Sequence, residues 1–345
     1  MTATKRRRCC LAKSVSGWWI DSDGSGPLTS RFRDSIPASE MGEGSLRIAV
    51  HYSAVNYKDA LALTGSPGVV RKPPLIPGID SAGVVEESSH SALPEGTPVV
   101  ITGYGYGENR HGGLATAVMG EPEHVIALPP ELSLHHAATL GTAGITAGLA
   151  VAALQRHGVT PESSALPIAV SGAAGGVGSL ALALLSAAGY SSVAITGRVE
   201  ESSYLTNLGA TEVLSRDEFL THPQRPLLGE RFAGAIDQAG GDMLATLLSC
   251  VETDGVVAAC GLAASADLPT TVLPFILRGV SLLGINSVFQ TQAVRQDLWN
   301  HFAATVDSLH CDEIAEDIPL DKALEIAPRV LSGRTRGRVV VRVRD

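Results

Sequence analysis

The chain has 345 residues, which is enough for two domains that each bury a core. Lysine and arginine total 26 against 35 acidic residues, and the net charge of −9 argues against nucleic acid or an anionic membrane as the main partner. The five cysteines are scattered without C-x-x-C spacing, which disfavours a disulfide framework or a structural zinc site. No uninterrupted apolar run approaches the ~20 residues that span a bilayer, and the start MTATKRRRCCLAKS lacks a secretion signal's apolar segment. We therefore expect a cytoplasmic protein that does not bind membranes.

The first third of the chain is rich in turns. Between about residue 7 and residue 126, short strand-like runs such as LRIAVHY, AGVVEES and TPVVITG are separated by glycine and proline. Residues 137–154 are then continuously small and apolar, wider than one amphipathic stripe. The pattern predicts a β-rich domain, followed by a helix buried between two domains.

The second half alternates apolar strand candidates with helical ones, beginning with PIAVSG and VGSLALALLSAAG. Continuously apolar strands joined by crossover helices are typical of a parallel sheet covered on both faces. The last residues, GRVVVRVRD, form a strand that could return to the first domain. We expect the α/β class, with residues 1–136 and 308–345 forming the β-rich domain and residues 137–307 a doubly wound domain.

The stretch AVSGAAGGVG, residues 169–178, places four glycines between a buried strand and a helix expected to open near Gly176. Such a helix end offers unpaired N–H groups, and glycines let a pyrophosphate approach them. Against the G-x-G-x-x-G pattern, Ala173 replaces the first glycine, whereas Gly175 and Gly178 keep the second and third. The alternative is a glycine turn that only packs strand against helix. The candidate cradle is Ala174, Gly175, Gly176, Val177 and Gly178.

The second strand of this half ends in Thr196-Gly197-Arg198, where an NAD enzyme would carry an acid for the ribose hydroxyl. An arginine can instead bind a 2′-phosphate with two charge-assisted hydrogen bonds, so that NADPH is favoured over NADH. The alternative makes Arg198 a solvated loop residue and Glu200 the ribose ligand. Arg216, after the third strand, is a second candidate cation for the phosphate.

Five ordered strings carry a resemblance that covers nearly the whole chain from about Arg31. They are NYKDALALTG, PLIPGIDSAGVV, GYGYGENRHGG, VVAACGLA and LPTTVLPFILRGVSLLGINSV. Together with the glycine turn they resemble the medium-chain dehydrogenase/reductase superfamily, and within it the AcuI/YhdH type of acryloyl-CoA reductase. The resemblance implies a GroES-like catalytic domain, a Rossmann domain, a cleft between them, and a homodimer. Residues 1–30 fit the pattern less well.

Zinc members of this superfamily carry a Gly-His-Glu motif, a catalytic cysteine and a four-cysteine lobe. Here the corresponding residues are Pro77-Gly78-Ile79-Asp80, so we expect no metal site. Without a Lewis acid to hold an alkoxide, the favoured chemistry is reduction of a carbon–carbon double bond conjugated to a carbonyl. The protein must then hold the alkene near the nicotinamide and donate hydrogen bonds to the enolate oxygen.

The resemblance also implies residue roles. Tyr57 is expected beside the nicotinamide and is our candidate for hydrogen-bonding the substrate or relaying a proton, oriented by Asn56 and Asp59. The resemblance places Thr196, Gly197, Arg198 and Arg216 around the adenosine phosphate, and Leu262, Ile276 and Ser287 beside the nicotinamide half. The alternative for NYKD is that Asn56 caps a short helix while Tyr57 packs in the domain core.

Three functions stay open. The first is NADPH-dependent reduction of a short enoyl-CoA, with acryloyl-CoA to propanoyl-CoA as the leading reaction; the second keeps the cofactor but acts on a free quinone or small enone. The third is a protein that binds NADPH without turnover. Arg334, Arg336 and Arg338 could meet coenzyme A phosphates or belong to a solvated edge strand.

Overall fold

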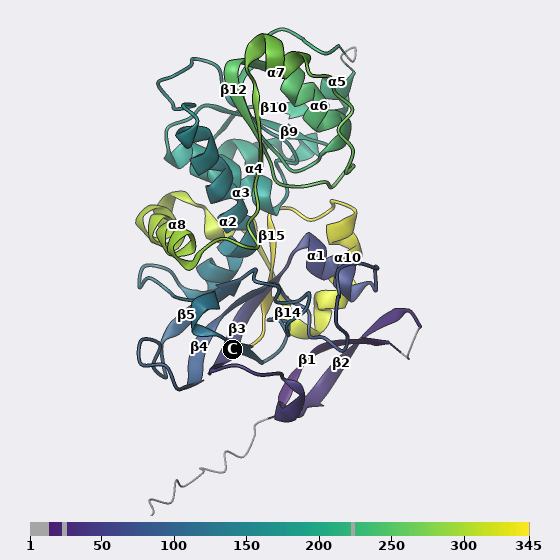
Figure 1. The fold of residues 1–345 in the computed structure, drawn as a ribbon, viewed down its shortest axis with the longest axis vertical. Coiled ribbons are helices and arrows are strands. Elements are labelled where there is room, and N and C mark those ends of the chain that lie inside the picture. The colour runs from purple at the N-terminus through teal and green to yellow at the C-terminus, as the bar shows by residue number, and fades with distance from the viewer. Residues whose placement is uncertain (1–13, 23–25, 222–224, 345) are drawn as a thin grey trace, which may run out of the picture.

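The computed structural model describes residues 14–22, 26–221 and 225–344. Two domains are stacked along the long axis of the molecule (Figure 1). The lower domain combines the first 130 or so residues with the C-terminal strands, and the upper domain contains the middle of the chain. The unexplained basic start, residues 1–13, lies outside the described residues.

The lower domain is built on a seven-stranded sheet. Its strand order is β14-β15-β3-β4-β5-β7, with β6 paired to β3. The strands are β3 (Leu46–Val55), β4 (Asp80–Ser88), β5 (Pro98–Thr102), β6 (Ala117–Gly120), β7 (Val125–Ala127), β14 (Ala315–Pro319) and β15 (Arg338–Arg342). A separate antiparallel hairpin, β1 (Val15–Ser22) and β2 (Leu28–Ile36), joins the domain through bridges to Ala115 and Leu75. Helices α1 (Tyr57–Leu63) and α10 (Ala323–Leu331) pack against each other.

The upper domain has a six-stranded parallel sheet of order β10-β9-β8-β11-β12-β13. Its strands are β8 (Ile168–Val170), β9 (Ser192–Thr196), β10 (Ala210–Ser215), β11 (Phe232–Asp237), β12 (Val251–Ala259) and β13 (Ser281–Gly284). Its helices are α3 (Gly176–Ala187), α4 (Ser202–Asn207), α5 (Arg216–Leu220), α6 (Gly241–Cys250), α7 (Leu273–Arg278), α8 (Gln292–Thr305) and α9 (Cys311–Ile314). The doubly wound order confirms the predicted fold class.

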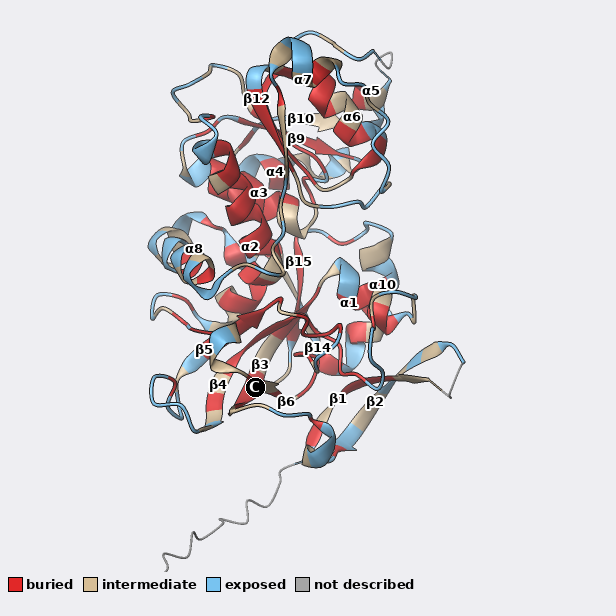
Figure 2. Ribbon diagram, in the orientation of Figure 1, coloured by how far each residue is buried: buried red, intermediate tan, exposed pale blue. Residues whose placement is uncertain are grey.

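Helix α2 (Leu134–Arg156) connects the two sheets. It kinks at Gly141, whose φ of 41° and ψ of −147° are not helical, and it packs against α3 and β4. Among the described residues, this helix alone is long and apolar enough to cross a bilayer, contrary to the sequence-based expectation, but 89% of its apolar window is buried. Figure 2 shows α2 and α3 as mostly buried, so α2 is a core helix between the domains, as predicted.

One expectation about the last strand is wrong. Strand β15 lies between β14 and β3, so it is not an edge of the sheet. Arg338, at its start, is buried with its side chain only 4% exposed, whereas Arg334 and Arg336 are exposed. Arg338 therefore neither forms a solvated edge nor reaches coenzyme A phosphates.

Candidate active site

Asn56 is the centre of a buried hydrogen-bond network at the start of α1. Its backbone N–H donates to Asp59 Oδ2 (2.9 Å), and its Nδ2 donates to Asp59 Oδ2 (3.0 Å) and Asp80 Oδ2 (2.9 Å). Its Oδ1 accepts from Arg338 Nη1 at 2.7 Å. Since both ends of the amide are bonded, the orientation of Asn56 and of the helix that follows is fixed.

Asp80 and Arg338 form the buried ion pair of this network. Arg338 Nη2 donates to Asp80 Oδ2 at 3.0 Å, and the two side chains are 4% and 1% exposed. Asp80 Oδ1 accepts from the backbone N–H (2.8 Å) and the hydroxyl (2.5 Å) of Thr142 beside the kink in α2. Arg338 Nε donates to Thr139 O at 2.9 Å. The pair therefore joins β4, β15, α1 and α2 at the junction of the two domains.

Asp59 is the most perturbed carboxyl group of the site. Burial raises its pKa to about 6, the nearby Asp80 carboxylate acts in the same direction, and hydrogen bonds from Asn56 and from the Ile79 N–H oppose the rise. Its Oδ1 accepts from the N–H groups of Gly78 (3.1 Å) and Ile79 (2.9 Å). Asp59 thus fastens α1 to the Pro77–Asp80 segment, as an orienting residue should.

Tyr57, the first residue of α1, does not pack in the core. Its side chain is 42% exposed, while Asp59 and Ala60 on the other side of the helix are buried. The alternative that we drew for NYKD is therefore half right, since Asn56 does occupy the cap position of the helix. The exposed Tyr57 is therefore accessible to a ligand.

The glycine turn lies directly over this network. Helix α3 begins at Gly176, as predicted, and a Cβ built on Gly176 would lie 2.8 Å from Arg338 Cδ. A Cβ on Gly178 would lie 2.5 Å from the carbonyl oxygen of Gly172, so the third glycine permits close packing of strand and helix. Gly175 and Gly176 remain partly exposed. The turn thus has the bare backbone that a pyrophosphate needs at a helix start, within contact distance of the Asn56 network.

The candidate adenosine corner follows β9. Thr196 is buried at the strand end, and Gly197 lies beside Arg216, whose Cζ would be 3.0 Å from a Cβ on that glycine. Arg198 Nη2 donates to the carbonyl oxygens of Ala174 (3.0 Å) and Thr335 (2.8 Å), so this arginine is tied to the glycine turn. Arg216 stays exposed, with its Nε 2.9 Å from Asp217. Two cations therefore flank Gly197.

The remaining predicted residues fall at two different ends of the sheet. Leu262 and Ser287 follow β12 and β13, and because all strands are parallel they lie at the same end as the glycine turn and Thr196. Ile276 lies on α7, before β13, at the opposite end, and is 68% exposed. The structure does not bring Ile276 together with the other candidates.

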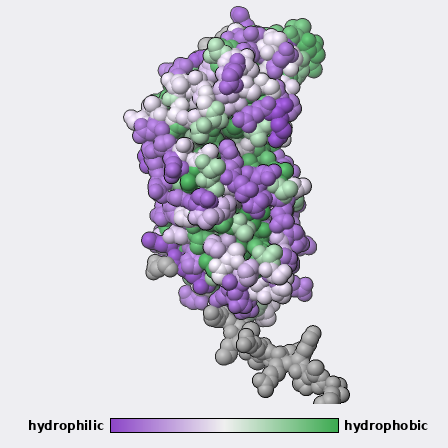
Figure 3. All heavy atoms as spheres, turned by 90° about the vertical axis from the view of Figure 1, so that its left-hand side faces the viewer, coloured by the Kyte–Doolittle hydropathy of each residue, from purple (hydrophilic) through white to green (hydrophobic). Residues whose placement is uncertain are grey.

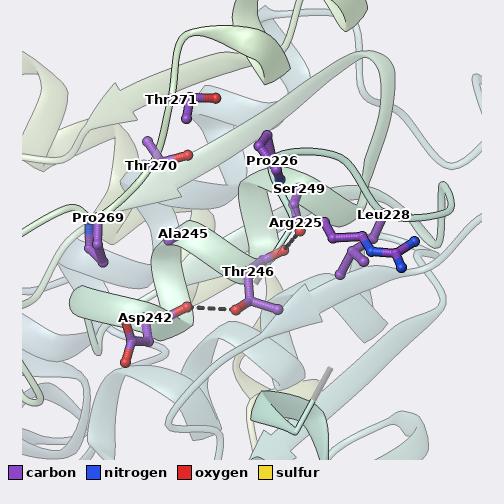
Figure 4. A pocket seen from close by; sticks show the side chains of 10 residues that line it. All are labelled: Arg225, Pro226, Leu228, Asp242, Ala245, Thr246, Ser249, Pro269, Thr270 and Thr271. Atoms are coloured by element: carbon purple, nitrogen blue, oxygen red, sulfur yellow. Dashed lines mark hydrogen bonds between the residues drawn. The ribbon is translucent and has the colours of Figure 1, made fainter. Parts of the chain in front are cut away.

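Two pockets were found outside this junction. One, of about 160 Å³, lies on α6 and the 269–271 segment of the upper domain, where Thr246 donates to Asp242 O (Figure 4). The other lies in the lower domain beside His111, Lys72 and Met41. Neither contains a residue that we predicted for the site.

The described parts of the chain offer little support for a metal site or a reactive thiol. No group of three or more His, Cys, Asp or Glu side chains there is arranged to hold a metal ion. Cys260 donates to Asp237 O at 3.2 Å, and burial raises the pKa of its thiol to about 12, which disfavours a thiolate nucleophile. This agrees with packing as the role of Cys260.

Sequence reasoning missed two features. In the sequence, Arg338 stands out only as one of three alternating arginines. Its contact with Asn56 spans 282 positions, so no local pattern reveals it. Lys58 lies inside the quoted NYKD string, but its partner Glu108 lies 50 positions away. In both cases, the only sign in the sequence is a charged residue for which the neighbouring residues suggest no partner.

The geometry can be compared with known proteins. Residues 42–167 match the alcohol dehydrogenase GroES-like domain, and residues 176–304 match the zinc-binding dehydrogenase family. The acrylyl-CoA reductase AcuI of Ruegeria pomeroyi is 42% identical over 94% of this chain and 98% of its own. The chain belongs to the acrylyl-CoA reductase (AcuI) family, within the medium-chain dehydrogenases/reductases. The putative quinone oxidoreductase YhfP of Bacillus subtilis is 39% identical over 90% of this chain and 93% of its own.

Two similar solved structures bear on the cofactor. The yhdH oxidoreductase of Salmonella enterica in complex with NADP superposes with a TM-score of 0.90 at 40% identity, over 95% of this chain and 100% of that one. The Bacillus subtilis yhfP with NAD bound superposes with a TM-score of 0.91 at 36% identity, over 96% of this chain and 100% of that one. The expected dinucleotide is confirmed, and NADPH is the form that this AcuI-family chain is equipped to use.

Proposed function

We propose that this protein reduces the conjugated double bond of a short enoyl-CoA with NADPH, converting acryloyl-CoA to propanoyl-CoA. The observation that supports the proposal is the contact of the glycine turn with Arg338, whose guanidinium also donates to Asn56, the residue before the exposed Tyr57. The relationship to acrylyl-CoA reductase AcuI supports the substrate.

When bound, NADPH supplies the hydride that adds to the β carbon of the alkene. The N–H groups at the start of α3, beside Gly175 and Gly176, would hold its pyrophosphate. Arg198 and Arg216, which flank Gly197, would bind the 2′-phosphate, and their charges would favour it over a bare hydroxyl. The wall around the dinucleotide would be completed by Thr196, Gly197, Leu262 and Ser287. Ile276 takes no part in this proposal, because it lies at the opposite end of the sheet.

Tyr57 is the candidate catalytic residue. Its exposed hydroxyl can donate a hydrogen bond to the thioester oxygen, on which negative charge collects during the reduction. Asn56 and Asp59 position Tyr57 by fixing the start of α1 through their hydrogen bonds to each other and to the Gly78 and Ile79 N–H groups. We expect Tyr57→Phe to lower kcat about tenfold or more while the Kd of NADPH stays the same. An unchanged kcat would remove the hydroxyl from the mechanism.

The chemistry that we propose uses no metal. The position of the Gly-His-Glu motif holds Asp80, whose two oxygens are occupied by Thr142, Asn56 and Arg338. An enzyme stripped with a chelator and reassayed with and without added Zn²⁺ should show equal turnover. A rate restored by Zn²⁺ alone would contradict this part of the proposal.

A spectrophotometric assay tests the reaction itself. Acryloyl-CoA, crotonyl-CoA and a simple quinone are each compared with NADPH and with NADH. The proposal expects the highest kcat/KM for an enoyl-CoA with NADPH. Faster turnover of the quinone would favour the second candidate, the activity that the name of the Bacillus subtilis relative suggests. Binding of NADPH without any oxidation would favour a non-catalytic protein.

We also propose a homodimer formed through the edge of the upper sheet. Strand β13 has one neighbour, β12, and its other edge is open within the described chain. The nearby helix α7 exposes Ile276 and Leu277, and Val272 just before it is also exposed. Figure 3 shows an apolar patch at this upper end of a surface that is otherwise mixed. A mass of one protomer in light scattering at micromolar concentration would contradict this proposal, and Leu277→Asp should dissociate the dimer.

A further inference from the structure

The exposed lysine that follows Tyr57 in the chain is held by an ion pair. Lys58 is the next residue of α1, and its Nζ lies 2.9 Å from Glu108 Oε1. The lysine side chain is 47% exposed, whereas that of Glu108 is 9% exposed. Arg71 approaches the other oxygen of Glu108, with Nη2 to Oε2 at 3.9 Å, and its backbone N–H donates to Glu108 O at 2.8 Å. A nearly buried carboxylate therefore holds one ammonium group in a fixed place.

The loop that carries Glu108, residues 103–110, is attached to both domains. Near its start, the Tyr104 N–H donates to Val288 O (3.1 Å) and the Tyr104 hydroxyl donates to Gln290 O (2.8 Å), in the segment after β13. Near its end, Glu108 holds Lys58 of α1. Ser287, one of the residues expected beside the nicotinamide, directly precedes that anchoring segment. The loop thus links Glu108, the partner of Lys58, to the segment after β13 at the cofactor end of the parallel sheet.

We propose that Lys58 donates a hydrogen bond to the thioester carbonyl oxygen of the substrate, together with Tyr57, and that Glu108 positions it. This inference rests on the proposed function. Hydride addition to the β carbon moves the π electron pair of the alkene toward the carbonyl, so that an enolate forms with its negative charge on the thioester oxygen. A proton from water then adds to the α carbon, which gives the saturated thioester and the oxidised dinucleotide.

In this step Lys58 acts by charge and hydrogen bonding, and the proton comes from water. A donor aimed at an oxygen that becomes negative stabilises the transition state more than the ground state. Tyr57 and Lys58 are both exposed in the first turn of α1. Their side chains leave the helix about 100° apart, so in the proposed complex the two donors approach the oxygen from different directions. The pair Lys58–Glu108 also explains why a carboxylate is nearly buried in a loop that otherwise makes turns.

The test compares two substrates and three variants. Acryloyl-CoA carries the phosphates of coenzyme A, whereas acryloyl-N-acetylcysteamine keeps the thioester and lacks them. Lys58→Met should lower kcat/KM about 100-fold on both substrates, mainly through kcat, because one oxyanion donor is lost. The Kd of NADPH, measured by fluorescence, should stay within about twofold of the wild-type value, since one lost donor to the substrate leaves dinucleotide contacts intact.

Lys322→Met is the matched control, because Lys322 also pairs with a glutamate (Nζ to Glu325 Oε1, 2.7 Å) and is 48% exposed. It should leave both substrates unaffected. The double variant Lys58→Met/Glu108→Gln removes both charges, so that a loss caused only by an unpaired Glu108 would be reversed; we expect kcat to stay low. Glu108→Gln alone should lower kcat less than Lys58→Met, with KM nearly unchanged.

Three results would overturn the proposal. Lys58→Met could lose activity only on acryloyl-CoA, which would place Lys58 on the phosphates; it could keep full activity on both substrates; or the double variant could recover the wild-type kcat. A failure of the proposed function looks different. In that case the wild-type enzyme itself oxidises no NADPH with either thioester, and both proposals fall.

Discussion

The Asn56 network and the adenosine corner solve different problems with the same kinds of residue. In the network, Arg338 is buried and contacts Asn56, Asp80 and the α2 backbone, so its place is fixed by many bonds. In the corner, Arg216 is exposed and meets only a neighbouring aspartate among its ion pairs. Buried charges here set the geometry between domains, whereas exposed charges are left to recognise a ligand. Mutations in the two regions should therefore change different properties.

The largest expected difference concerns two arginines that lie two positions apart. Arg338→Met leaves Asp80 buried without its main cation, and we expect a loss of about 3–5 kcal/mol in the free energy of unfolding. Arg336 is exposed, and Arg336→Met removes its pair with Glu201 (3.7 Å) and its cation–π contact with the Tyr204 ring (4.8 Å to the centroid). Each such contact of an exposed side chain is worth about 1 kcal/mol or less, so this variant should lose about 2 kcal/mol at most. Urea denaturation of both variants measures the contrast, and equal losses would refute it.

Asp59 provides a pH-dependent test of the network. Burial raises its pKa in the folded protein to about 6 from the ordinary 3.8, so the folded state binds more protons than the unfolded state between these values. The contribution of Asp59 to stability is therefore complete below pH 3.8 and is lost as the pH rises through 6. The gap corresponds to about 3 kcal/mol. As the pH rises from below 3.8 to above 6, the unfolding free energy of the wild type minus that of Asp59→Asn should fall by up to this amount. The same pH dependence of the unfolding free energy in both proteins would contradict the prediction.

Two glycines of the turn separate packing from cofactor binding. A Cβ on Gly178 would meet the Gly172 carbonyl oxygen at 2.5 Å, so Gly178→Ala should cost about 1–3 kcal/mol in stability. On Gly175 the same atom would lie 3.3 Å away, which a small shift relieves. Gly175→Ala should therefore keep its Tm and bind NADPH less tightly. If Gly175→Ala leaves the Kd of NADPH unchanged, the turn serves packing alone.

The smallest effect is expected at the exposed corner. Arg216→Ala should reduce the preference for NADPH over NADH about tenfold, because one cation for the 2′-phosphate is lost while NADH never used it. Glu200→Gln is the counterpart, since it should leave NADH binding intact unless Glu200 is the ribose ligand. The ratio of kcat/KM values for the two cofactors decides between them.

The features that the sequence predicted differ from those that it did not in how far apart the interacting residues lie in the chain. The strand–glycine–helix turn, the doubly wound order and the cap at Asn56 were predictable because each depends on residues that are near in the chain. Arg338 was not, since its partners Asn56 and Asp80 come from distant strands and helices. Ile276 was assigned to the cofactor from a resembling string, but the direction of β13 carries it to the other end of the sheet. The domain boundaries at residues 137 and 308 stay predictions.

The central claim is that hydride passes from NADPH to the β carbon of an enoyl thioester. The most direct measurement uses NADPH that carries deuterium at both C4 positions of the nicotinamide ring, with acryloyl-CoA and mass spectrometry of the product. The account predicts propanoyl-CoA that carries one deuterium on its β carbon. Oxidation of NADPH without labelled propanoyl-CoA, or deuterium on the α carbon, would contradict it.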